Sequence, residues 1–352
     1  MERFQYTGLP HRVLFGVGCV DQLAAELALA GIHRPALLCS RRSRPHIEGL
    51  LETAGVDIAG IFDAVRMHVP RTTWQSAAQL CDANQADGTV AFGGGSATGL
   101  AKMLARDQRL PFVAVPTTYS GSEMTPVWGF TQNNLKRTGR DTRVLPSTVI
   151  YDPALTLDLP ASIAAPSGLN AMAHSVEALY AEDANPLMSG VAEQSIRLLG
   201  NALPDIVSRP DNLAARSDAL QGAWLAGLAL GSVSMGLHHK LCHVLGGSFN
   251  LDHALAHSDV LPHALNYNRH AAPEALAVVA KALNCEDGPA GLYQLARRLN
   301  VPAGLKDLGM SAERLDEAAG LASQNPYYNP APVSREGIRE LLDNAWHGRP
   351  PA

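Results

Sequence analysis

The sequence predicts an α/β domain followed by an all-helical domain. Up to about residue 155, short apolar or β-branched segments alternate with segments of helical spacing. After Pro160 the helical spacing continues alone. The 352 residues are enough for two domains of about 100–200 residues each. We therefore expect residues 1–158 to form the first domain and residues 159–352 to form the second.

The first domain is expected to contain a mostly parallel sheet. Its strands are predicted at residues 12–15, 35–39, 89–92, 112–115 and 148–151, with helices between them that include residues 20–30, 73–81 and 97–105. Strands that alternate with helices form parallel sheets covered by helices on both faces. This is a Rossmann-like arrangement, in which ligands bind at the carboxyl ends of the strands.

The second domain is expected to be all-α. Helical spacing is present at residues 167–180, 190–207, 214–231, 272–283, 292–299, 311–323 and 334–345. Several of these segments begin after a Ser or Asp, the residues that cap helix N-termini. No segment in this half alternates convincingly as a strand would.

Composition and charge exclude several classes of protein. Hydrophobic residues make up 46% of the chain and charged residues 17%, as in an ordinary soluble globular protein. No run approaches the ~18 apolar residues of a membrane span, and residues 1–6 lack the features of a secretory signal. The five cysteines are scattered, which fits the reducing cytoplasm. A net charge of −5 argues against nucleic acid as a partner. It is still compatible with a small anionic substrate, because a local cluster of cations outweighs the net charge at close range.

A glycine-rich loop is the first candidate binding site. Gly93, Gly94, Gly95 and Ser96 stand between the expected strand at 89–92 and the helix at 97–105. Glycines let a phosphate approach the backbone, and a helix N-terminus offers it unpaired N–H groups. The loop is not a full GxGxxG motif, and the plain alternative is a tight turn that binds nothing. We interpret it as a phosphate site for a dinucleotide.

Hydroxyl side chains follow the next strand. Thr117 and Thr118 come directly after the segment ending at Pro116. Because the carboxyl ends of parallel strands meet at one edge, these threonines are candidates to line the same ligand, although polar loops also contain many hydroxyls.

Histidines are concentrated in the second domain, where seven of thirteen lie between His174 and His263. Asn170 and His174 are four residues apart, as are His239 and His243, so each pair shares one helix face. His253 follows beyond Gly246-Gly247-Ser248, which we expect to be a loop. Any one of these histidines could be a core residue with a backbone partner. Together they indicate a metal site or a polar substrate site, whereas His238, His257 and His263 are interpreted as packing or supporting residues.

These motifs resemble those of the iron-containing alcohol dehydrogenases. The resemblance rests on the order of the glycine loop, the segment Pro116-Thr117-Thr118, the pair Asn170 and His174, and three further histidines: His239, His243 and His253. It covers essentially the whole chain. The resemblance implies that the metal-ligand positions are Asn170, His174, His239 and His253, and that His243 serves the chemistry.

Asn170 departs from the pattern of the metal-dependent members, which carry Asp at this position. A neutral amide is a poor ligand for a divalent ion, so the site loses a full charge. In this respect the chain resembles the maleylacetate reductase branch of the family. That resemblance implies that the protein reduces maleylacetate to 3-oxoadipate during the breakdown of aromatic compounds. Chlorinated maleylacetates are further candidate substrates, and no tightly bound metal is expected.

The resemblance also assigns roles to particular residues. His243, His239 and His253 are the implied catalytic residues, and His174, Asn170 and Lys240 would bind the dicarboxylate substrate. The cofactor would be held by Gly94, Gly95, Ser96, Thr117, Thr118 and Lys136, and the residues that end the first long strand add Arg41.

The cofactor is expected to be NADH, with NADPH also accepted. The segment Cys39-Ser40-Arg41-Arg42 that ends the first long strand has no carboxylate to repel a 2′-phosphate, and Arg41 could pair with one. The alternative is that this arginine lies on the solvated start of the next helix. The resemblance to the family also implies that the protein forms a homodimer.

Three other functions are compatible with parts of this pattern. The nearest is a metal-dependent alcohol or polyol dehydrogenase of the same superfamily, which metal analysis would distinguish. A nucleotide-binding protein without catalysis would have little use for the histidines, and a metal-dependent cyclising synthase would need basic residues for a substrate phosphate that are not recognisable here.

Overall fold

The computed structural model describes residues 4–132 and 135–351. Within this part of the chain there are two compact units. One consists of residues 9–159, and the other of residues from 160 onward together with residues 4–8.

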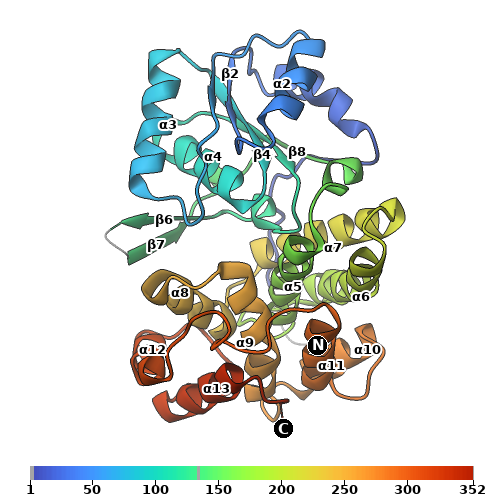
Figure 1. Ribbon diagram of the computed structural model, residues 1–352, viewed down its shortest axis with the longest axis vertical. Coiled ribbons are helices and arrows are strands. Elements are labelled where there is room, and N and C mark those ends of the chain that lie inside the picture. The colour runs from blue at the N-terminus through green and yellow to red at the C-terminus, as the bar shows by residue number, and fades with distance from the viewer. Residues whose placement is uncertain (1–3, 133–134, 352) are drawn as a thin grey trace. The chain divides into compact units, whose positions relative to one another are not determined.

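A six-stranded parallel sheet forms the centre of the first unit (Figure 1). Its strands are β1 (Val13–Phe15), β2 (Pro35–Leu38), β3 (Gly60–Phe62), β4 (Gly88–Gly93), β5 (Phe112–Pro116) and β8 (Thr148–Tyr151). Their order is β1-β8-β5-β4-β2-β3, and every neighbouring pair is parallel. The predicted parallel sheet is confirmed.

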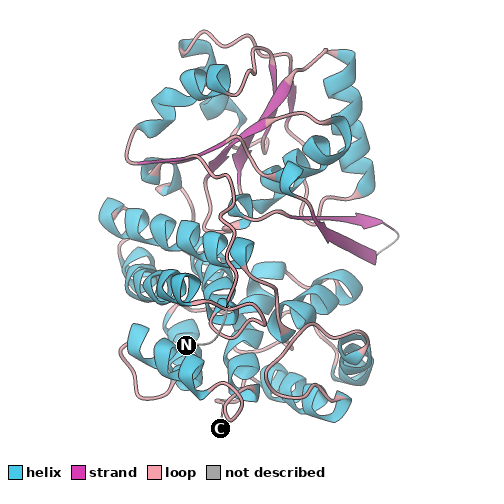
Figure 2. Cartoon of the chain, turned by 180° about the vertical axis from the view of Figure 1, so that it is seen from behind, coloured by secondary structure: helices cyan, strands magenta, loops and turns pink. Residues whose placement is uncertain are grey.

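Helices cover this sheet because its central strands are apolar on both faces. Every residue of β2, β5 and β8 is buried. Alternate residues of a strand point to opposite faces, and one set, which includes Leu37, Val90 and Val113, packs in a core with Leu27 and Leu51. The helices are α1 (Leu23–Leu29), α2 (Arg44–Thr53), α3 (Arg71–Ala83) and α4 (Gly95–Gln108), and α4 contacts β4 and β5. Figure 2 shows the strands with these helices around them.

Two features of this unit were not predicted. The first is β3, a three-residue, half-buried strand beside β2. The second is an antiparallel hairpin of β6 (Val127–Gln132) and β7 (Leu135–Arg140), in which Val127 pairs with Arg140. Short 3-10 helices complete the unit: η1 (Cys19–Gln22), η2 (Ser122–Met124), η3 (Thr142–Val144) and η4 (Pro153–Thr156).

Within the described residues from 160 onward, every named element is a helix, as predicted. The α-helices are α5 (Ala161–Ala178), α6 (Pro186–Ser208), α7 (Leu213–Ser232), α8 (Leu237–Phe249), α9 (His253–Tyr267), α10 (Pro273–Ala282), α11 (Gly288–Arg298), α12 (Leu315–Ser323) and α13 (Arg335–His347), with the 3-10 helix η5 (Ala312–Arg314). No helix in the described part of the chain is both long and apolar enough to cross a bilayer.

Helix α5 lies at the centre of the helical unit. It packs against α6, α7 and α9, and nearly all of its residues after Ile163 are buried. The close approach of α6 depends on Gly168, where an added Cβ would lie 2.5 Å from Cδ2 of Leu203. The site-bearing helix is therefore held on several sides, which fixes the direction of its side chains.

The expected loop at Gly246-Gly247-Ser248 is wrong. These residues belong to α8, which continues to Phe249. The chain turns at Asn250, which has a left-handed φ of 55°. Asp252 then caps α9 by accepting a hydrogen bond from the backbone N–H of Leu255. Tertiary packing of α8 against α9 and α12 thus outweighs the low helix propensity of two adjacent glycines.

Candidate active site

In the first unit, the glycine loop has the predicted strand–loop–helix setting. Gly93 ends β4 with φ at +143°, and α4 begins at Gly95. An added Cβ at Gly94 would lie 2.8 Å from Oγ1 of Thr118, so only glycine lets the two loops approach this closely. The backbone N–H of Thr117 donates to the carbonyl of Gly93, which joins the ends of β4 and β5. The backbone of the first loop and the hydroxyls of the second therefore lie side by side, as a dinucleotide cradle requires.

Arg41 is 85% exposed and pairs with a carboxylate that the sequence reasoning did not consider. Its Nε lies 3.8 Å from Asp63, which follows β3 at the same end of the sheet. Arg44 also pairs with Asp63, at 3.1 Å. The arginines at the end of β2 thus have an acid beside them, and the role of Arg41 stays a prediction. Lys136 lies in β7, and its side chain is outside the described part of the chain.

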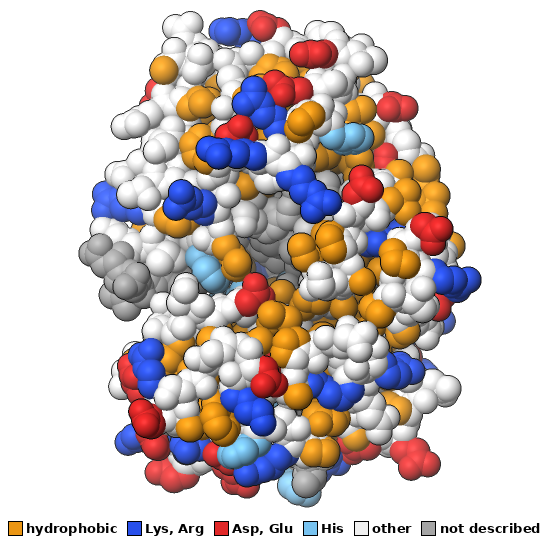
Figure 3. Space-filling view, viewed as in Figure 1, with side chains coloured by type: hydrophobic (Ala, Val, Ile, Leu, Met, Phe, Trp, Pro, Cys, Tyr) orange, Lys and Arg blue, Asp and Glu red, His pale blue; other side chains and the backbone are white. Residues whose placement is uncertain are grey.

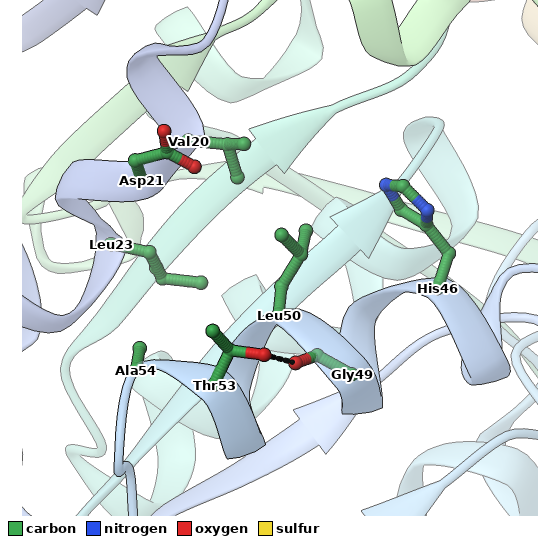
Figure 4. A pocket seen from close by; sticks show the side chains of 8 residues that line it. All are labelled: Val20, Asp21, Leu23, His46, Gly49, Leu50, Thr53 and Ala54. Atoms are coloured by element: carbon green, nitrogen blue, oxygen red, sulfur yellow. Dashed lines mark hydrogen bonds between the residues drawn. The ribbon is translucent and has the colours of Figure 1, made fainter.

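A pocket of about 620 Å³ lies between α2 on one side and η1 and α1 on the other (Figure 4). Asp21 and His46 are its ionisable lining residues, and the remainder are apolar or small. None of its lining residues was a candidate in the sequence, and it does not include the glycine loop.

In the helical unit, the candidate substrate residues come from three helices. Asn170 and His174 are one turn apart on α5, His239 and His243 are one turn apart on α8, and His253 begins α9. The structure brings these segments together because α5 packs against α9 and α9 packs against α8. Sequence spacing predicted the pairs, and the tertiary contacts unite them.

The imidazole rings form a continuous cluster. The ring centroids of His174 and His239 are 5.2 Å apart, and those of His243 and His253 are 6.5 Å apart in a stacked arrangement. His257 connects these pairs, with its centroid 5.0 Å from His239 and 4.3 Å from His253. We refer to these five histidines, with His238, as the histidine cluster.

His238 and His257 are thus inside the cluster and not merely near it. Both are fully buried, and the His238 ring nitrogen Nε2 bonds to the backbone carbonyl of His257. Burial lowers the pKa of His238 to about 4 and that of His257 well below its ordinary value. Both rings are therefore neutral near neutral pH. His263 lies on the same helix, where burial and then Arg297 lower its pKa to about 4.

Two polar atoms in the predicted set have no hydrogen-bond partner among the residues that the structure describes. They are Oδ1 of Asn170 and Nε2 of His239, and both are buried. A buried polar atom without a partner costs about 1–3 kcal/mol, so such atoms indicate a place where a ligand or water completes the bonding. This part of the cluster can therefore accept a polar ligand.

Sequence reasoning missed Glu177, which is fully buried three residues after His174. Its Oε2 lies 2.5 Å from Nδ1 of His239. Burial acts to raise the pKa of Glu177, but His239 with its hydrogen bond, His238 and the backbone N–H of Gly236 together hold that pKa below the ordinary value. The only signal in the sequence was one acidic residue in a helical segment that has no Lys, Arg or second acid.

Tyr327 was also missed. Its hydroxyl lies 3.3 Å from Nδ1 of His243, and Nζ of Lys240 lies 5.8 Å from the centre of its ring. Lys240 is partly exposed and directly follows His239 on α8. The face of the molecule in Figure 3 shows Lys and Arg interspersed with Asp and Glu, without a broad surface of one sign.

Family models match both halves of the chain. The model described as iron-containing alcohol dehydrogenase matches residues 10–153, and the C-terminal model of the Fe-containing alcohol dehydrogenase family matches residues 164–346.

Individual relatives agree with these matches. The maleylacetate reductase of Sphingobium indicum is 48% identical over 349 residues, which cover 99% of each protein. The crystal structure of maleylacetate reductase from Agrobacterium tumefaciens matches with a TM-score of 0.95 at 43% identity, and that from Rhizobium sp. with 0.94 at 44%. Both structural matches cover 100% of both chains.

Proposed function

The chain belongs to the iron-containing alcohol dehydrogenase family, and from this premise we propose that it reduces maleylacetate to 3-oxoadipate with a nicotinamide cofactor. Full-length relatives at 44–48% identity are maleylacetate reductases, which supports this substrate. The reaction would belong to the breakdown of aromatic compounds in the cytoplasm. We further propose a homodimer and activity on chlorinated maleylacetates.

The observation that carries the proposal is the uncharged donor set of the helical unit. Asn170 stands one helical turn from His174, and its Oδ1 is buried with no partner in the described residues. A hard divalent cation prefers carboxylates, and the buried carboxylate of the cluster, Glu177, is already bonded to His239. The four ligand positions therefore have no carboxylate to balance the charge of a divalent ion, whereas the amide NH₂ of Asn170 and the imidazole N–H groups can donate hydrogen bonds to the oxygens of a ketone and two carboxylates.

Maleylacetate is a dicarboxylate in which an alkene is conjugated to a ketone. Bound nicotinamide would supply a hydride to the alkene carbon β to the ketone. Negative charge then develops on the ketone oxygen, and a proton must reach the adjacent carbon. His243 is proposed as the acid or oxyanion donor, because an imidazole can donate a proton near neutral pH. Its Nδ1 already contacts Tyr327, which restrains the ring.

The other cluster residues would bind the substrate. His239 and His253 would share in oxyanion stabilisation, since preorganised donors lower the cost of developing charge. His174, Asn170 and Lys240 would hold the carboxylates by hydrogen bonds or charge. No step in this scheme passes through a metal ion.

The first unit would hold the cofactor. Gly94, Gly95 and Ser96 would bind the pyrophosphate at the N-terminus of α4, and Thr117 with Thr118 would lie along the adenosine. Support comes from the close approach of the two loops at Gly94, where an added Cβ would lie 2.8 Å from Oγ1 of Thr118. We propose NADH as the main donor and NADPH as an accepted one, with roles for Arg41 and Lys136 as predicted from the sequence.

The direct test follows NADH oxidation by the purified full-length chain with maleylacetate, before and after treatment with a strong chelator. We expect turnover that the chelator does not reduce. Absence of NADH oxidation with maleylacetate, or its loss in chelator with recovery on adding iron or zinc, would refute the proposal. In the first case, metal-dependent oxidation of alcohols or diols would favour the alternative dehydrogenase.

A further inference from the structure

We infer that Glu177 is a positioning residue of the histidine cluster, whose carboxylate fixes the His239 ring and ties α8 to α5. The inference rests on the proposed function for its catalytic consequence. Glu177 and His239 are separated by 62 residues in the chain, so their contact exists only in the folded helical unit.

Both carboxylate oxygens of Glu177 accept hydrogen bonds from α8. Oε2 accepts from the backbone N–H of Gly236 at 2.9 Å and lies 2.5 Å from Nδ1 of His239. Oε1 accepts from the backbone N–H of His239 at 3.2 Å. Glu177 is fully buried, and a buried carboxylate is tolerated when its oxygens are bonded in this way. The first N–H groups of α8, which lack partners within their own helix, are thus capped from α5.

This contact determines which nitrogen of His239 meets a ligand. A carboxylate can only accept, so Nδ1 of His239 carries the hydrogen. Nε2, at the opposite end of the ring, is then the atom that meets the substrate: it accepts a hydrogen bond when the ring is neutral and donates one to a developing oxyanion when the ring is protonated. That nitrogen is the one without a hydrogen-bond partner in the described residues. Glu177 thus directs His239 without itself touching the substrate.

Gly236 provides a second, independent way to disturb the contact. An added Cβ there would lie 2.9 Å from Oε1 and 3.3 Å from Cδ of Glu177. Gly236 also forms an isolated β-bridge with Tyr328, which follows the tyrosine that contacts His243. A methyl group at this position cannot be accommodated unless the Glu177 carboxylate or the start of α8 shifts, and either shift alters the contact.

The experiment compares Glu177→Gln and Gly236→Ala with Asp183→Asn in the full-length chain. Asp183 is the matched control, since its Oδ1 accepts from the backbone N–H and the hydroxyl of Ser234, just before α8, without contacting a ring. In Glu177→Gln the amide NH₂ cannot accept, so at least one of the three donors loses its partner. We expect kcat/KM for maleylacetate to fall about 10- to 100-fold, with the dissociation constant of NADH unchanged.

The second readout is the state of His239 in the free protein. Nitrogen-15 histidine NMR, assigned with His239→Gln, should show hydrogen on Nδ1 in the wild type and in Asp183→Asn. The Nδ1 signal should be altered or replaced by the Nε2-protonated form in Glu177→Gln and in Gly236→Ala.

Wild-type His239 signals and wild-type kcat/KM in both cluster variants would overturn the inference, as would equal losses in Asp183→Asn. If Glu177→Gln does not fold, Gly236→Ala decides, because it retains the carboxylate. If the wild type does not reduce maleylacetate, the proposed function fails, and the NMR comparison still decides the role of Glu177.

Discussion

Arg297 interacts with two titratable groups of α9, and acidification should change the free energy of unfolding in opposite directions through these two groups. Asp259 on α9 lies 3.4 Å from Arg297, and burial raises its pKa to about 7 even though Arg297 acts to lower it. Asp307 also raises it. His263, one turn further along α9, has its pKa lowered to about 4 by burial and by Arg297. Removing one group at a time should reveal a pH dependence that the other now conceals.

The sign for each group follows from which state binds the proton more tightly. The unfolded Asp has a pKa of 3.8, so the folded state binds the Asp259 proton more tightly and stability falls as pH rises from about 4 to 7. The unfolded His has a pKa of 6.5, so the unfolded state binds the His263 proton more tightly. Stability therefore falls as pH decreases from about 6.5 to 4.

The magnitudes follow from these pKa values. Between about pH 8 and pH 5, the Asp259 contribution increases the free energy of unfolding by roughly 2–3 kcal/mol, and the His263 contribution decreases it by about 2 kcal/mol. The two nearly cancel in the wild type. Relative to wild type, Asp259→Asn should lose about 2–3 kcal/mol more on acidification, and His263→Gln should lose about 2 kcal/mol less.

The assay is urea unfolding followed by circular dichroism at about pH 8 and pH 5 for the wild type, both single variants and the double variant. The double variant should return close to the wild-type difference between the two pH values. If both single variants changed with pH in parallel with the wild type, neither group would have the displaced pKa on which the reasoning depends.

Three further predictions concern the proposed site. His243→Ala should lower kcat by roughly 10²–10⁴ while NADH binding, measured by fluorescence titration, stays unchanged; near-wild-type turnover would remove this histidine from the mechanism. Asn170→Asp should increase the affinity for Zn²⁺ in calorimetric titration by restoring a carboxylate, and equal affinities would show that the remaining histidines do not converge on an ion. Asp63→Asn should raise kcat/KM for NADPH relative to NADH, because it frees Arg41 from its acidic partner; an unchanged ratio in this variant and in Arg41→Ala would exclude that arginine from cofactor selection.

The regular elements with a strong hydrophobic pattern were predictable. Strands β2, β4, β5 and β8 are short apolar runs that are almost entirely buried, and the burial explains their pattern. Strand β3 is a three-residue strand at the sheet edge, and β6 belongs to a separate hairpin, so most residues of both are only partly buried. Their pairing depends on neighbouring strands and could not be read from local spacing.

The predicted loop at Gly246 failed for a related reason. Glycine is common in turns, and nothing local distinguishes a turn from a helix whose glycine faces a neighbour. In the folded chain Gly246 is buried on α8, which packs against α9 and α12. The packing of α8 against its neighbours therefore stabilises the helix at Gly246 and Gly247 despite the low helix propensity of glycine.

Local patterns in the sequence were enough to predict strands β1, β2, β4, β5 and β8, the glycine loop before α4, and the helical pairs Asn170 with His174 and His239 with His243. These are local properties, because the period of a helix or strand places residues that are near in sequence. Only the tertiary structure decided that His257 lies within the cluster and that the Glu177 carboxylate bonds to His239. A buried carboxylate must find donors wherever the packed helices place them, and here they come from a segment about sixty residues away.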